Sequence, residues 1–370
     1  MSSIQSFLHI VSKDRLLSAL IVLALILIFL QQPSPRELTH AVDWPTIAIL
    51  SALLVLTRGF MISGVMRVWG QSMLYRMSHV RQLALSLVVA SIVLSMLMTN
   101  DVALFVVVPF TLGLSRLARL PTAELVVFEA LAVNAGSLMS PIGNPQNILL
   151  WQQSGLSFLD FFLQMAPLGL LTCALLVLLV WWRLRPDPIV FHSAQDDSAS
   201  SPRLAWLCAC LLVLFVIAVE YKLALPGLLL VLAWIGYRDW QLVWRAGWSL
   251  ILVFVLMFVN IYLVSQLVWV EWLLAWLGER SVLIHLVSAA LLSQVISNVP
   301  ATMLMLESVP ASTALAYGVN VGGFGLAIGS LANLIALRMS GQPGVWKLFH
   351  YYAVPFLSVS LLIASSLVWI

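Results

Sequence analysis

Two short stretches of this otherwise apolar chain carry side-chain oxygens at the same spacing. They are Ser95-x-x-x-Thr99-Asn100 and Ser293-x-x-x-Ser297-Asn298. Hydroxyl and amide oxygens, together with free backbone carbonyls, suit a hard cation such as sodium. The two stretches therefore predict two small cation sites of the same construction.

A second motif lies downstream of each stretch, and its two copies are 186 residues apart. The copies are Asn134-x-Gly136 with Ile142-Gly143-x-x-x-Asn147, and Asn320-x-Gly322 with Ile328-Gly329-x-x-x-Asn333. The glycines, and Pro145 in the first copy, predict a break in each helix. Free carbonyls at a break suit a cation, and free amides suit an anion. The second copy lacks the prolines, so we expect it to unwind less.

These motifs together outline one substrate site between two cation sites. The residues predicted to contact the substrate are Thr99, Asn100, Asp101, Asn144, Pro145, Asn147, Ser297, Asn298, Val299, Ser330 and Asn333. The alternative is that these polar side chains only cap broken helices or join spans by hydrogen bonds. Capping does not require the duplication, so the duplicated positions favour binding.

Two carboxylates within apolar segments are candidates for proton coupling. Asp101 follows the first stretch, whereas Val299 takes its place in the second. Asp101 is therefore a candidate proton carrier or fixed negative ligand of the site. Glu129, about one and a half turns before Asn134, could relay protons or could only join packed helices.

The elements that must position these residues are membrane-spanning helices. The chain has 370 residues, of which 62% are hydrophobic and 9% charged, and its mean hydropathy is +1.04. Soluble domains carry about 25% charged residues, so this composition predicts an all-α polytopic membrane protein. The nine predicted crossings cover residues 16–30, 45–66, 122–150, 161–182, 204–220, 222–237, 247–269, 312–337 and 347–369.

Two further apolar stretches, residues 83–115 and 282–308, are interrupted near their middle by the polar motifs. The second stretch is too short to cross about 30 Å of hydrocarbon twice. We therefore predict that both stretches are re-entrant hairpins. With the N-terminus in the cytoplasm, fourteen of the eighteen Lys and Arg residues face the cytoplasm and three face outside, while Arg58 lies within a span. This bias follows the positive-inside rule and places the C-terminus outside.

The predicted order of elements indicates an inverted repeat. Five crossings separate the two hairpins, and an odd number turns one half upside down relative to the other. The first half covers residues 1–185, with its hairpin at 83–115 and its broken helix at 122–150. The second covers residues 204–370, with its hairpin at 282–308 and its broken helix at 312–337. Residues 186–203 form a hydrophilic cytoplasmic linker. Inverted halves with interrupted helices are typical of secondary transporters.

Other functional classes fit the sequence less well. The net charge of +3 is dispersed over the loops, so no nucleic acid partner is expected. No paired histidine or carboxylate motif indicates an enzyme, and no cofactor is expected. A passive channel is the alternative, since re-entrant half-helices also build selectivity filters. Two inverted hairpins in one chain favour a transporter that moves a small ionic solute across the bilayer by alternating access.

The motifs resemble those of the ion transporter superfamily. This superfamily includes divalent-anion/sodium symporters, citrate-metal transporters, arsenite permeases and one class of sodium/proton antiporter. The resemblance rests on Thr99-Asn100-Asp101-Val102-Ala103 and on Asn134-x-Gly136 with Pro141-Ile142-Gly143-Asn144-Pro145-x-Asn147, and it extends along the whole chain. It implies a homodimer in a bacterial inner membrane, in which a mobile transport domain moves as an elevator against a scaffold domain.

The resemblance also implies the ligands of two sodium ions. One set is Ser95, Thr99, Asn100 and Gly143, and the other is Ser293, Ser297, Asn298 and Gly329. The chain departs from the dicarboxylate branch at Asp101 and Val299, where that branch has threonine. Since an anionic tip repels an anion, the chain looks closer to the arsenite and sodium/proton branches, with sodium or a proton as the coupling ion.

Overall fold

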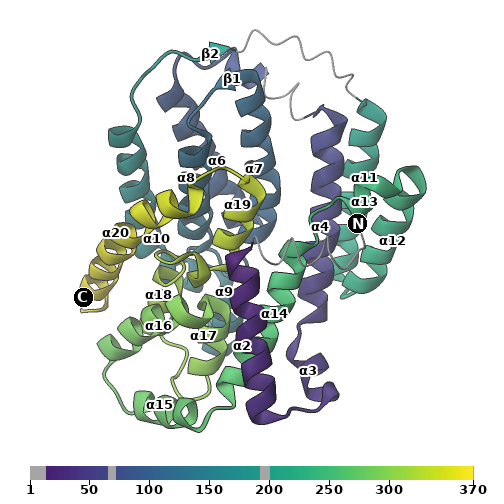
Figure 1. The fold of residues 1–370 in the computed structure, drawn as a ribbon. Helices are drawn as coiled ribbons and strands as arrows, with labels where there is room; N and C mark the ends of the chain where they lie inside the picture. The colour runs from purple at the N-terminus through teal and green to yellow at the C-terminus, as the bar shows by residue number, and fades with distance from the viewer. Residues whose placement is uncertain (1–13, 66–71, 192–200, 370) are drawn as a thin grey trace. The chain divides into compact units, whose positions relative to one another are not determined.

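The computed structural model describes residues 14–65, 72–191 and 201–369, which are mostly helical (Figure 1). The helices are α2 (Arg15–Gln31), α3 (Pro35–Ala41), α4 (Trp44–Ser63), α6 (Val80–Leu97), α7 (Asn100–Leu117), α8 (Thr122–Ser137), α9 (Pro145–Ser154), α10 (Phe158–Arg183), α11 (Pro202–Glu220), α12 (Ala224–Arg238), α13 (Trp240–Trp244), α14 (Ser249–Ser265), α15 (Val268–Gly278), α16 (Val282–Ile296), α17 (Asn298–Met305), α18 (Thr313–Val321), α19 (Leu331–Ser340) and α20 (Val345–Val368). A short 3₁₀ helix, η1 (Ala327–Gly329), precedes α19. The predicted helical class is confirmed.

Six helices in the described part of the chain are long and apolar enough to cross a membrane, or seven if α14 and α15 form one broken span. The six are α4, α6, α7, α10, α11 and α20. Their lengths match the 17 to 25 or so residues that a bilayer requires. The chain is therefore a multi-pass membrane protein, and nine crossings stay a prediction.

The chain folds into two compact units, and each unit draws on both halves of the sequence. The first unit contains Met1–Ser63 and Ser201–Leu273, and the second contains Gly64–Ser200 and Leu274–Ile370. The residues before and after the linker thus contribute helices to both units, and the two inverted halves stay a prediction. All copies of the polar motifs lie in the second unit.

Within the first unit, α2 packs against α14, and α4 packs against α11 and α12. Two long-range hydrogen bonds join α2 to α14. Asn260 donates Nδ2 to the carbonyl oxygen of Leu20 at 3.0 Å, and Gln31 donates Nε2 to that of Leu263 at 2.7 Å. Such side-chain bonds to backbone carbonyls hold apolar helices in register where the hydrophobic effect between them is weak.

The centre of the second unit is α8, which contacts α6, α7, α10, α19 and α20. All of its residues except Ala123 and Glu124 are buried. A helix that is apolar on every side is expected to lie inside a bundle, and the sequence of α8 fits this place. At its exposed start, Glu124 forms an ion pair with Arg183 of α10, and Tyr352 of α20 donates to the same carboxylate oxygen at 3.3 Å.

The two predicted hairpins have arms of different length. The first consists of α6 and α7, which meet at Met98 and Thr99, and each arm is long enough to span the membrane. The second consists of α16 and the much shorter α17, which meet at Ser297. The first pair thus extends beyond its predicted bounds of 83–115, and its re-entrant course stays a prediction.

The predicted linker, residues 186–203, is described only at its ends. Residues 192–200 lie outside the described part of the chain. Before them, β2 (Val190–Phe191) pairs antiparallel with β1 (Ala118–Arg119), directly after α7. Ala118 is opposite Phe191, and Arg119 is opposite Val190. The beginning of the linker is therefore fixed to the end of the first hairpin by a short pair of strands that the sequence did not predict.

Candidate functional site

The tip of the first hairpin lies against the break that follows α8. The backbone N–H of Asn100 donates to the carbonyl oxygen of Gly143 at 2.8 Å, and its Nδ2 donates to Asn134 Oδ1 at 3.3 Å. Asn100 is buried, whereas Thr99 is half-buried and makes no capping bond with its side chain. The structure therefore brings Asn100, Asn134 and Gly143 together, with Thr99 at the edge of this group.

The first break interrupts helical structure from residue 138 to residue 144. Asn144 caps α9, because its Oδ1 accepts the backbone N–H of Asn147 at 2.9 Å. Pro145 occupies the first helical position, where no N–H is needed. Asn147 donates Nδ2 to three carbonyl oxygens of residues 137, 138 and 140 at 3.0–3.2 Å. The unwound carbonyls are thus satisfied by a side chain from the next helix.

The second break runs from residue 322 to residue 330 and contains only the single turn of η1. The expectation that it unwinds less than the first is therefore wrong. A glycine rather than a proline interrupts this helix, because Gly325 has a φ of +90°, which residues other than glycine rarely adopt. Asn333 donates Nδ2 to the carbonyl oxygen of Gly323 at 2.8 Å, as Asn147 does to residue 137.

Asparagine side chains join the two broken helices to each other. Asn134 donates Nδ2 to Asn333 Oδ1 at 2.8 Å, and Asn320 donates Nδ2 to Asn147 Oδ1 at 2.7 Å. Residues 134 and 320 are equivalent under the offset of 186, and so are 147 and 333. Each half therefore donates from its first asparagine to the last asparagine of the other half.

A second layer of bonds repeats the same exchange. Ser330 donates Oγ to Asn134 Oδ1 at 3.1 Å, and Asn144 donates Nδ2 to Asn320 Oδ1 at 3.0 Å. Residues 144 and 330 are again 186 apart. We call Asn134, Asn144, Asn147, Asn320, Ser330 and Asn333 the asparagine crossing. All six side chains are neutral and at most 4% exposed.

The tip of the second hairpin approaches the same crossing. A Cβ atom at Gly323 would lie 3.2 Å from Asn298 Nδ2 and 3.5 Å from Asn134 Oδ1, so Asn298 lies beside the crossing. Ser297 has a φ of +74°, is fully buried, and its Oγ has no hydrogen-bond partner among the described residues. A buried oxygen without a partner is costly, which is expected where a ligand completes its bonding.

The remaining predicted ligands lie on the hairpin arms and in the breaks. Ser95 donates Oγ to the carbonyl of Ile92 at 3.0 Å, and Ser293 donates Oγ to that of Ala289 at 2.7 Å. Both hydroxyls face a glycine, because a Cβ at Gly136 or Gly322 would collide with them. Gly329 is buried in the second break, and Val299 is half-buried in the first turn of α17.

Gln294 holds the second break in place, and the sequence alone did not single it out. Its Nε2 donates to the carbonyl oxygens of Ala290 and Gly322 at 3.1 and 2.7 Å, and its Oε1 accepts the N–H of Leu326 at 2.7 Å. Gln294 directly follows Ser293 in the second hairpin, and the residue that follows Ser95 at the equivalent position of the first hairpin is Met96. Gln294 has no counterpart, so the search for repeats could not find it.

Replacing Gln294 by methionine, the residue of the first hairpin, is expected to lower the free energy of unfolding by about 1–3 kcal/mol, because the carbonyl of buried Gly322 and the N–H of exposed Leu326 both lose their partner. The measurement is thermal unfolding of the purified protein. Gln266→Met is the matched control, since the Gln266 side chain is exposed and makes one bond of 3.4 Å to its neighbour Ser265. Equal stability of Gln294→Met and the wild type would contradict the assigned role.

The two candidate carboxylates have different surroundings. Asp101 is half-buried in the first turn of α7, and its carboxylate has no bonding partner among the described residues. Glu129 is fully buried, and its Oε1 accepts from Thr111 of α7, while Oε2 has no partner in the described part. Glu129 thus joins α8 to α7, and its relay role stays a prediction. A carboxylate at this depth without a basic partner requires a proton or cation to balance its charge.

The site residues that the motifs indicated but the predicted set omitted are Asn134 and Asn320. Both are members of the repeated motif, and the structure places them at the centre of the crossing. The constant offset of 186 was the signal that could have found them. No group of three His, Cys, Asp or Glu side chains that could hold a metal ion occurs in the described ranges.

The known proteins to which this chain is similar are membrane proteins and transporters. Residues 7–314 match a family model described as CitMHS, citrate transporter. The chain is 44% identical to inner membrane protein YbiR of Escherichia coli K12, over 95% of this chain and 94% of that protein. It is 30% identical to the uncharacterized transporter MJ0456 of Methanocaldococcus jannaschii, over 86% and 88%. It is 29% identical to the silicon efflux transporter LSI3 of Oryza sativa subsp. japonica, over 43% and 34%.

Proposed function

Because the chain belongs to the citrate transporter family, a family of transporters rather than enzymes, we propose that it is a secondary active transporter of the inner membrane. It moves a small ion or anion and couples this movement to sodium or protons. The location follows from the inner-membrane relative and from the apolar helices. The N-terminus lies in the cytoplasm and the C-terminus outside, as the distribution of Lys and Arg predicts.

The asparagine crossing is the observation that carries this proposal. Two helices that break at equivalent positions exchange bonds in both directions, from residue 134 to 333 and from 320 to 147. A two-fold relation between halves of opposite orientation accounts for such an exchange. Broken helices that meet between inverted halves form the midplane site of many secondary transporters.

The chemistry of the tips supports a cation as the coupling ion. The side chains that meet at the tips and the crossing are neutral oxygen and amide groups, and Asp101 adds one carboxylate. The fully buried Ser297 Oγ without a partner offers an oxygen to a cation at the second tip. At the first tip, the carbonyl of Gly143 accepts the N–H of Asn100, and a sodium ion there would compete with this bond.

The division into two units supports an elevator-type movement. The second unit contains both hairpins and both breaks, as expected of a mobile transport domain. The first unit contains none of the motifs, as expected of a scaffold. In this mechanism the scaffold also forms the contact between two copies, so the proposal includes a homodimer. Cross-linking of single cysteines across the first unit in membranes tests the dimer directly.

The experiment that tests coupling is transport by purified protein in sealed vesicles. We expect sodium or pH gradients to drive uptake of at least one of arsenite, silicic acid, citrate or a dicarboxylate. Asp101→Asn removes the charge while keeping the shape, so the pH-driven signal is expected to fall to the level of empty vesicles. Asp160→Asn is the control, because Asp160 is exposed and only contacts Ser157 at the start of α10.

Two results would contradict the proposal. In the first, no gradient moves any of the solutes, and the wild type and Asp101→Asn behave alike. In the second, planar bilayers show discrete single-channel currents, which would identify a passive channel built from hairpins.

A further inference from the structure

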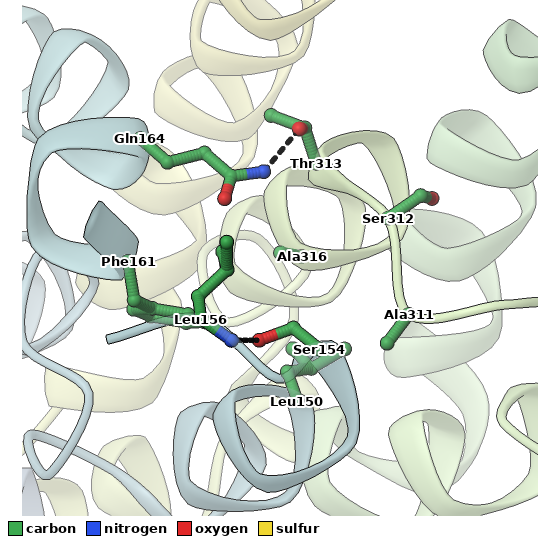
Figure 2. A pocket seen from close by; sticks show the side chains of 9 residues that line it. All are labelled: Leu150, Ser154, Leu156, Phe161, Gln164, Ala311, Ser312, Thr313 and Ala316. Atoms are coloured by element: carbon green, nitrogen blue, oxygen red, sulfur yellow. Dashed lines mark hydrogen bonds between the residues drawn. The ribbon is translucent and has the colours of Figure 1, made fainter. Parts of the chain in front are cut away.

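A cavity of about 300 Å³ lies in the second unit, apart from both hairpin tips. Figure 2 shows the side chains that line it, which come from the end of α9, the start of α10, the start of α18 and the loop residues directly before α10 and α18. Its lining residues are Leu150, Ser154, Leu156, Phe161, Gln164, Ala311, Ser312, Thr313 and Ala316. Its volume is at the lower end of the range for small-molecule sites.

The lining of the cavity combines hydrogen-bonding groups with an apolar wall and carries no charge. Gln164 bonds to Thr313 across one side, and Ser154 Oγ accepts the N–H of Leu156 at 3.3 Å on another (Figure 2). Ser154, Gln164, Ser312 and Thr313 supply all the polar side chains. An ion that entered would lose hydration without a counter-charge, whereas an uncharged solute could exchange water for these groups.

The cavity has a specific cause in the sequence. The positions 186 residues before Ala311, Ser312 and Thr313 hold Leu125, Val126 and Val127, which are at most 1% exposed within α8. In the second half the equivalent helix begins only at Thr313, where the Ser312 hydroxyl caps it by accepting the backbone N–H of Leu315 at 3.3 Å. Small residues outside a helix therefore replace large residues inside one, and space remains.

The floor of the cavity is connected to the asparagine crossing by one helical turn. Ala316 lines the cavity, and its carbonyl oxygen accepts Nδ2 of Asn320 at 2.8 Å. Leu150 lines it from α9, one turn after Asn147. Asn320 and Asn147 are themselves bonded at 2.7 Å. A molecule in the cavity thus contacts the two helices whose asparagines meet in the crossing.

We propose that this cavity is a second binding site, which takes a small uncharged solute bearing amide or hydroxyl groups. The site is separate from the cation and substrate positions at the tips, and its existence does not depend on the coupling ion.

The test uses labelling of one cysteine in the full-length protein. Ala311→Cys places a thiol in the lining, and its rate of reaction with N-ethylmaleimide is measured after subtraction of the wild-type signal. Acetamide and urea are the uncharged probes, and acetate and guanidinium are their charged counterparts of similar shape. We expect acetamide and urea to slow the reaction at least threefold in a saturable way, and their charged counterparts to leave it unchanged.

Three variants complete the experiment. Asp187→Cys is the control, because Asp187 is exposed between α10 and β2, outside the membrane-crossing helices and the lining, and no probe is expected to change its labelling. Ala316→Leu, introduced into Ala311→Cys, fills the cavity and is expected to abolish protection. Thr313→Val keeps the volume of the side chain and removes one hydroxyl. The probe concentration that gives half-maximal protection is therefore expected to rise about 2- to 10-fold, which is the equivalent of losing one hydrogen bond.

The proposal is wrong if neither uncharged probe slows labelling at the highest concentration that leaves the protein folded. It is also wrong if acetate or guanidinium protects as well as its uncharged counterpart, or if protection is equal at Asp187→Cys. If Ala316→Leu does not fold, the test rests on Thr313→Val alone. An unchanged probe concentration for half-maximal protection in Thr313→Val would then show that the probes do not bind at this lining. Since no transported solute enters this assay, its outcome is independent of the proposed transport.

Discussion

Asn134→Ala is expected to abolish transport and to lower the free energy of unfolding by about 3–5 kcal/mol, because several buried polar groups lose their partners at once. Asn134 accepts from Asn100 and Ser330 and donates to Asn333 and to the carbonyl of Ala130. A loss of about 3 kcal/mol in the site corresponds to about a 100-fold change in an equilibrium constant. Asn320→Ala is expected to act in the same way.

Asn260→Ala is the matched control for this prediction. Asn260 is also an asparagine within an apolar helix and is as buried as Asn134, at 4% exposed. It lies in the first unit, donates to the carbonyl of Leu20, and its Oδ1 has no partner in the described residues. We expect a smaller loss of stability, of about 1 kcal/mol. Transport that survives Asn134→Ala within twofold, or that falls equally in Asn260→Ala, would refute the role of the crossing.

Double-mutant cycles separate an exchange between halves from contacts within one half. The pairs 134 with 333 and 320 with 147 are bonded, so each is expected to show a coupling energy of about 1 kcal/mol. The pairs 134 with 147 and 320 with 333 lie within one half and have no hydrogen bond between their side chains, so their effects are expected to add. The same coupling in all four pairs would indicate a general collapse of the region.

Gly143→Ala is expected to be the second most damaging substitution. An added Cβ would lie 2.8 Å from Ser137 Cα, and backbone atoms cannot rotate away as a side chain can. The loop must therefore shift, which displaces the carbonyl that accepts the N–H of Asn100. We expect at least a tenfold rise in the sodium or proton concentration for half-maximal transport, the equivalent of about 1.4 kcal/mol.

Gly155→Ala is the control for Gly143→Ala. Gly155 ends α9 with a φ of +68°, and no atom of the described residues lies within 4 Å of an added Cβ. Its only cost is the left-handed backbone, about 1–2 kcal/mol. Stability measured by thermal unfolding and transport measured in vesicles together distinguish the two sites. If both variants lose stability equally and neither changes the half-maximal concentration, the close packing at Gly143 has no role in binding.

Composition and periodicity were sufficient to predict the helical membrane class and the positions of both breaks. The offset of 186 located Asn134, Asn147, Asn320 and Asn333, because a repeated function leaves a repeated pattern. It did not reveal that their side chains form hydrogen bonds from one half to the other. The spacing along the sequence does not determine whether the bonding partner of an asparagine lies in its own half or in the other half. The spacing alone therefore does not identify Asn134 and Asn320 as residues of the site.

Features without a counterpart in the other half were the ones that sequence reasoning missed. Gln294 stands where the first hairpin has Met96, so no repeat marked it. The second break is as open as the first although it lacks proline, because Gly325 adopts a left-handed backbone and Gln294 supplies the lost bonds. The cavity at Ala311 to Thr313 likewise exists only where the second half departs from the first.

The bond between Asn134 and Asn333 joins residues that are 199 positions apart, and this has a consequence for biogenesis. During synthesis, α8 enters the bilayer long before α19 leaves the ribosome, so the amide of Asn134 must wait for its acceptor. The nascent first half is therefore an incomplete intermediate, with a hydrogen-bond donor that lipid cannot satisfy. Insertion of α19 supplies this acceptor late in synthesis, before α20 completes the second unit, and two fragments produced separately should recover a stable protein only when present together.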